Sequence, residues 1–147
     1  MRSGGFIRII LAVLGLMIFV PLLDAQTQSF SLNGTWNGHY LWSQGPVDFT
    51  LTLDVDGGKC LGRTKEVNTF GDKSATYLYA NISCLSMGVH PGGPFRFHKQ
   101  YDGTGNVVHE VECSGNVSTD GNTISGNWMI LSNTIWSTGT FSMSRGH

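Results

Sequence analysis

The segment at residues 47–67 reads VDFTLTLDVDGGKCLGRTKEV and decides the fold class. Apolar and polar residues alternate over 47–55, which is the period of a strand with one buried face. The turn Asp56-Gly57-Gly58 supplies residues that tolerate the positive φ of a tight hairpin, and a second strand-like run follows at 59–67. The segment therefore predicts an antiparallel β-hairpin.

The rest of the chain repeats this pattern. Further strand-like runs are expected at 33–42, 75–84, 95–101, 107–118, 123–131 and 134–145, with mostly short links rich in glycine and aspartate. Such links join antiparallel neighbours, because a parallel crossover needs about a dozen residues or more. No run has a sustained helical period. We predict an all-β fold, an eight-stranded antiparallel up-and-down barrel. Alternation alone also fits a β-sandwich, but the uniform short links favour the barrel.

Residues 1–25 form an apolar leader. Arg2 and Arg8 precede an apolar run over 9–20, and Ala25 offers a small residue at a cleavage point. This is the layout of a secretory signal peptide, and the run is shorter than the roughly 20 residues that span a bilayer. We predict that residues 26–147 form a single secreted or periplasmic domain. An uncleaved membrane anchor is the alternative, because Leu23 stands where a small residue suits cleavage better.

Charge and spacing argue against several function classes. The chain has 9 Lys and Arg against 10 Asp and Glu, a net charge of −1, and no basic stripe, so nucleic acid is not an expected partner. The histidines lack metal-ligand spacing, and no glycine-rich phosphate loop opens a helix. His109 and Cys113 share a strand face but lie about 13 Å apart by strand rise, too far for a nucleophile–base pair. We therefore expect no catalytic residue, metal or cofactor, and a barrel enzyme is the least favoured hypothesis.

The tripeptide Gly34-Thr35-Trp36 opens the first predicted strand, and Arg145 ends the last one. This start resembles the Gly-x-Trp signature of lipocalins and the wider calycin group, in which a basic side chain of the last strand lies over the Trp. The resemblance implies that Trp36 and Arg145 form a packing pair at the closed end of the barrel. In length the chain is more similar to avidin-type barrels and small periplasmic protease-inhibitor barrels, since it has no room for the lipocalin C-terminal helix.

Three cysteines follow the leader. Cys60 and Cys84 lie at equal distances from the turn near Asp72, so they are expected opposite each other on adjacent strands. An oxidising compartment would allow a disulfide between them. Cys113 has no such partner and is expected as a buried thiol.

The alternation of inward and outward residues along the predicted strands places several aromatic and polar side chains inside the barrel. The predicted ligand-binding set is Tyr40, Trp42, Tyr101, His109 and Trp128, with Phe49, Phe95 and Phe97 also facing inward. Strand directions place Tyr101 and His109 at the end opposite Trp36, where a ligand would enter. Aromatic walls with a few polar tips suit a small apolar ligand.

A lumen filled by its own side chains is the equal alternative, because eight-stranded barrels are often only wide enough for that. The function would then be a non-enzymatic interaction or protease-inhibitor-like module acting through a barrel rim and residues 85–94. This long link is expected either to cover the mouth or to press against a protein partner. A membrane is an expected partner only if the leader is uncleaved.

Overall fold

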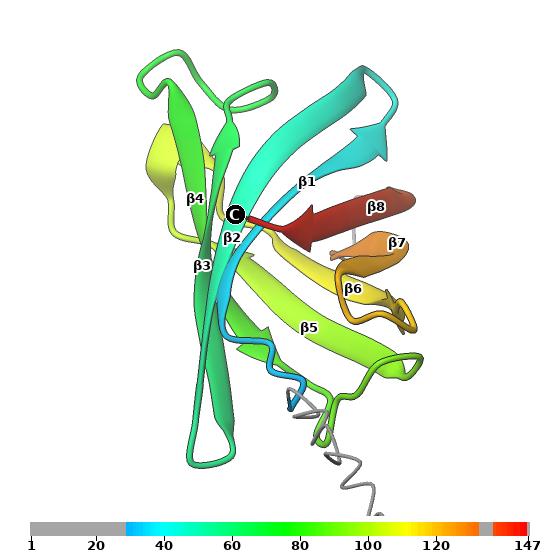
Figure 1. The fold of residues 1–147 in the computed structure, drawn as a ribbon. Helices are drawn as coiled ribbons and strands as arrows, with labels where there is room; N and C mark the ends of the chain where they lie inside the picture. The colour runs from blue at the N-terminus through cyan, green and yellow to red at the C-terminus, as the bar shows by residue number, and fades with distance from the viewer. Residues whose placement is uncertain (1–28, 133–136, 147) are drawn as a thin grey trace, which may run out of the picture.

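The computed structural model describes residues 29–132 and 137–146. Its strands are β1 (Gly34–Trp42), β2 (Gly45–Asp56), β3 (Lys59–Val67), β4 (Tyr77–Cys84), β5 (Pro94–Tyr101), β6 (Glu110–Val117), β7 (Thr123–Leu131) and β8 (Thr138–Arg145). Each strand is antiparallel to the next, and β8 pairs with β1, which closes the barrel (Figure 1). The predicted eight-stranded up-and-down barrel is confirmed, and the sandwich alternative is wrong.

The predicted leader at 1–25 lies outside the described residues. No helix within the described part of the chain is long and apolar enough to cross a membrane.

The clearest boundary difference is at the start of β6, which begins at Glu110 rather than at 107. A tight turn takes up these residues: Gly103 has a φ of +94°, and the short 3-10 helix η1 (Thr104–Asn106) follows it. The N–H of Gly103 donates to the carbonyl of Val107 at 3.0 Å, so the backbone bonds locally before the ladder starts. β4 likewise begins two residues later than predicted, and residues 134–136 lie outside the described part of the chain.

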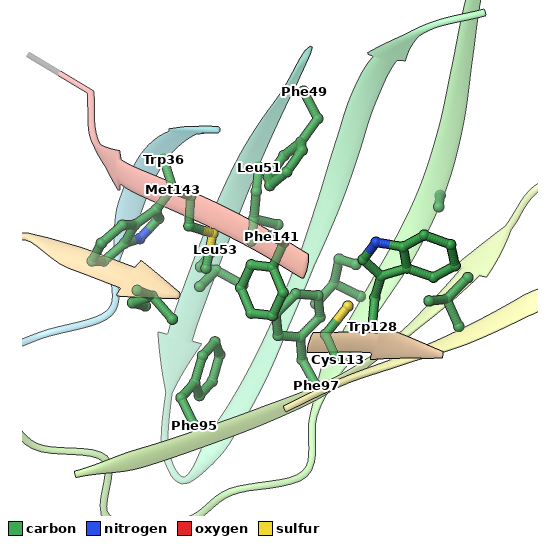
Figure 2. Close-up of a cluster of buried hydrophobic side chains, with 14 of the residues drawn as sticks. Trp36, Phe49, Leu51, Leu53, Phe95, Phe97, Cys113, Trp128, Phe141 and Met143 are labelled. Carbon is green, nitrogen blue, oxygen red and sulfur yellow. The ribbon is translucent and has the colours of Figure 1, made fainter. Parts of the chain in front are cut away.

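The end of the barrel where β1 begins is closed, and we call it the floor. Trp36 is fully buried, and its indole N–H donates to the carbonyl of Leu32 at 3.0 Å. Arg145 pairs with Trp36 in the β1–β8 register and holds its guanidinium 4.5 Å from the ring centroid. Figure 2 shows the apolar core, which extends from Trp36 on one side of the cluster to Trp128 on the other.

Strand direction decides which links lie at the floor. β1 runs away from the floor and every following strand reverses, so the β2–β3, β4–β5 and β6–β7 links return to it. The opposite end, which we call the mouth, carries the other links. The β4–β5 link therefore lies at the floor, and the expectation that residues 85–94 cover the mouth is wrong. Its Met87 and Val89 line a surface hollow there, together with Phe30 and Leu32.

The disulfide prediction is confirmed. Cys60 is bonded to Cys84 across β3 and β4, with Cα atoms 5.3 Å apart. Cys113 is free and buried. A disulfide of this kind is typical of proteins that fold in an oxidising compartment.

Candidate ligand-binding site

A cavity of about 210 Å³ lies inside the barrel, toward the mouth. All five residues predicted to bind ligand line it, so the structure brings that set together around one space. Phe95, in contrast, is buried near the floor and does not border the cavity. The described lining consists of Tyr40, Trp42, Ser43, Phe49, Thr64, Phe70, Phe97, Lys99, Tyr101, His109, Val111, Cys113, Trp128, Ile130, Ser137 and Phe141.

Aromatic rings hold one another in place along this wall. Tyr40 stacks on Phe49 with centroids 6.3 Å apart and meets Trp128 edge to face at 5.9 Å. The indole N–H of Trp128 donates to the carbonyl of Leu41 at 3.0 Å, which fixes the ring. An apolar wall that is already ordered before binding is what small-ligand pockets use.

A second aromatic group lies nearer the mouth. Tyr101 and His109, which sequence reasoning placed there as a pair, have ring centroids 4.8 Å apart. Phe70, from the β3–β4 link, contacts both rings at 5.8 Å. Burial lowers the pKa of His109, and the charge of Lys99 lowers it further, so the imidazole is neutral near pH 7.

A salt bridge is buried beside the cavity. Lys99 on β5 donates to the carboxylate of Glu66 on β3, and the two residues are only 7% and 1% exposed. The phenols of Tyr101 and Tyr40 also donate to Glu66, the latter at 3.2 Å. The Lys99 ammonium donates to the Tyr101 hydroxyl at 2.8 Å. The cluster therefore satisfies its charges internally, as a stable buried ion pair must.

The surroundings of this cluster keep its phenols neutral. Burial raises the pKa of Tyr40 and of Tyr101 above the ordinary range, and the negative charge of Glu66 raises both further. Both hydroxyls consequently keep their protons and donate them to the carboxylate of Glu66.

Thr64 adds a polar atom with no partner. It lies two residues before Glu66 on the inward face of β3, is 3% exposed and borders the cavity. Its Oγ1 is buried and has no hydrogen-bond partner within the described residues. Such a group costs free energy unless something else bonds it.

Sequence reasoning did not name Thr64, Glu66 or Lys99, although alternation carried the signal. Thr64 and Glu66 share the inward parity of Cys60 in the run at 59–67, and Lys99 lies between inward Phe97 and Tyr101. The signal in the sequence is a charged residue at an inward-facing position of a strand, as at Glu66 and Lys99. Phe70 carried no signal, because it lies in a link with no period.

Cys113 lines the cavity as an apolar group. Burial raises the pKa of its thiol to about 12, so the thiolate is scarce at neutral pH. Across the sheet it pairs with Phe97 of β5.

The architecture that results, a closed eight-stranded antiparallel barrel with a cavity in its lumen, is compatible with a calycin-like fold. Comparisons with protein-family models, with curated proteins and with solved structures found no match to this chain. Among the described residues, no three His, Cys, Asp or Glu side chains lie close enough to hold a metal ion.

Proposed function

We propose that this chain is a calycin-like binding protein that takes up a small, largely apolar ligand in the mouth half of its lumen. The observation that carries the proposal is the cavity of about 210 Å³ with its mostly aromatic wall. An apolar cavity of about 150 Å³ is large enough to bind benzene. The volume here therefore suits a ligand of one or two fused rings.

A secreted or periplasmic location forms part of this proposal. The Cys60–Cys84 disulfide supports it, because such bonds persist where the surroundings are oxidising. The signal-peptide layout of residues 1–25 supports it independently.

The chemistry of the wall favours binding over catalysis. The thiol of Cys113 is held protonated, the phenols of Tyr40 and Tyr101 are held neutral, and the Glu66 carboxylate is engaged by Lys99. Nucleophiles and general bases work when their pKa lies near the operating pH. These groups are instead suited to form a fixed wall, in which the one ion pair is neutralised internally.

Calorimetric titration with naphthalene tests the proposal. We expect saturable binding with one molecule per barrel, and a loss of affinity in Cys113→Met, whose longer side chain occupies part of the cavity. Ser114→Met is the matched control, because Ser114 is the next residue along β6 and is exposed on the outer face. Absence of saturable binding to the wild type, or an equal loss in both variants, would contradict the proposal.

A second candidate function is a non-enzymatic interaction or protease-inhibitor-like role through the floor rim and the 85–94 link. The observation that favours it is the exposure of Leu85 (48%) and Met87 (78%) on this link, beside the hollow at the floor. Apolar side chains that gather into one exposed patch mark interaction sites. Inhibition of a secreted protease that Met87→Asp abolishes and Cys113→Met leaves intact would support this role over the first.

A further inference from the structure

The polar groups beside the cavity have hydrogen-bonding capacity left over. An ammonium has three N–H donors, and the two described acceptors of Lys99 are Glu66 and Tyr101. The Oγ1 of Thr64, which can both donate and accept, has no described partner at all. The aromatic wall is therefore interrupted by a small polar patch, made of Thr64 and Lys99.

These two residues lie around the same space. Thr64 and Tyr101 belong to one cross-strand row, in which Ala80 of β4 pairs with both. Because Ala80 carries a single methyl group, the row has little bulk between the threonine and the tyrosine whose hydroxyl bonds Lys99. Both Thr64 and Lys99 border the cavity.

We propose that the ligand carries one uncharged oxygen, as a hydroxyl or a carbonyl, that bonds Thr64 Oγ1 and the remaining donor of Lys99. The apolar rings of the ligand then pack against Trp128 and Phe49 on the aromatic wall. This inference rests on the proposed function and specifies the chemical class of ligand for that site.

The ion pair explains why the oxygen is uncharged. Lys99 looks like a receptor for a carboxylate, but Glu66 already neutralises it. A carboxylate placed here would lie close to the buried Glu66 and would lose its hydration without gaining a free cation. The imidazole of His109 is neutral near pH 7 and supplies no positive charge either. A cation would face the ammonium of Lys99 with no unpaired anion to receive it.

A series of probes that share one ring frame tests the inference by calorimetry at neutral pH. The probes are naphthalene, naphthol, acetylnaphthalene and naphthoate. We expect naphthol and acetylnaphthalene to bind about tenfold or more tightly than naphthalene, because each satisfies a buried polar group that the hydrocarbon leaves unpaired. Naphthoate should bind more weakly than naphthalene.

The variant Thr64→Val removes the hydroxyl and keeps the shape of the side chain. We expect it to lower the affinity for naphthol about tenfold and to leave the affinity for naphthalene unchanged or higher. Thr52→Val is the matched control, because Thr52 is exposed on the outer face of β2. It should change neither affinity.

The outcomes separate this inference from the proposed function. If naphthalene and naphthol bind equally well, or naphthoate binds best, the uncharged-oxygen inference is overturned while lumen binding stands. Equal effects of Thr64→Val on naphthalene and naphthol overturn it in the same way. If none of the four probes binds, both the inference and the proposed function fail.

Discussion

The floor of the barrel is filled by apolar contacts, whereas the mouth half keeps a cavity beside a buried ion pair. At the floor, Trp36 is fully enclosed and Arg145 lies over it from the last strand. Toward the mouth, Glu66 and Lys99 are almost as deeply buried, yet Lys99 borders open space. Both regions are built from the residues that point inward, which are every second residue along a strand.

The contrast separates residues that hold the barrel together from residues that suit a ligand. Closing the floor requires tight packing, which gives no room for a guest. The mouth half keeps charges inside the barrel, which a well-packed apolar core does not need. Changes at the floor should therefore act on stability alone, while changes near the mouth should act on binding or on both.

Trp36→Ala should have the largest effect on stability. Removing this indole leaves a cavity at the floor, and the expected loss in the free energy of unfolding is about 3–5 kcal/mol. Trp42→Ala is the comparison at the mouth, where the ring is only half-buried, and should cost much less. Denaturant unfolding measures both. A cost for Trp42→Ala equal to that for Trp36→Ala would remove the distinction between the two ends.

Lys99→Met should destabilise the fold by about 3 kcal/mol, because it leaves Glu66 buried without its cation. The value lies at the low end for a broken buried pair, since Tyr40 and Tyr101 still donate to the carboxylate. The double variant Lys99→Met with Glu66→Leu should recover most of the stability in thermal melts but should not recover naphthol binding. A double variant less stable than Lys99→Met would show that the pair itself stabilises the barrel.

Loss of the Cys60–Cys84 disulfide should lower the free energy of unfolding by about 2–3 kcal/mol. The bond lies toward the floor, so the double variant Cys60→Ser with Cys84→Ser should leave naphthalene affinity unchanged at temperatures where it is folded. Chemical unfolding and calorimetry measure the two effects. A drop in affinity that exceeds the loss of folded protein would link the floor to the binding site.

His109 should give the smallest effect, a dependence of stability on pH. Its pKa in the folded barrel lies below the ordinary 6.5, so the unfolded chain binds more protons as the pH falls through that value. Stability should therefore decline below about pH 6.5, and His109→Gln should flatten this part of the profile.

Two aspartates act in a separate, more acidic range of pH. Hydrogen bonds from Ser74 and Ser118 lower the pKa values of Asp72 and Asp120 below 3.8, so their contribution is lost only under stronger acid. For the histidine, the contradicting result is a wild-type stability profile that is flat between pH 7 and 5, because it would show that the His109 imidazole is not desolvated.

The sequence predicted the barrel because each strand carried its own evidence: alternation in the run at 47–55, a turn at 56–58, and cysteines equidistant from the next turn. These are local signals; the uniform short links favoured a closed barrel, and the resemblance at Trp36 and Arg145 supported closure. The polar cluster was missed because a lysine and a glutamate from different strands meet only after the barrel forms. The place of the 85–94 link was also missed, although counting strand reversals from the floor would have given it.

The indole N–H signals of Trp128 and Trp36 provide the most direct test of lumen binding. Trp128 borders the cavity and donates to the Leu41 carbonyl, while Trp36 donates to the Leu32 carbonyl at the floor. During a titration of the wild type with naphthol, followed by NMR, the Trp128 signal should shift in a saturable way and the Trp36 signal should stay in place. No shift at Trp128, or equal shifts at both tryptophans, would contradict ligand binding in the mouth half of the lumen.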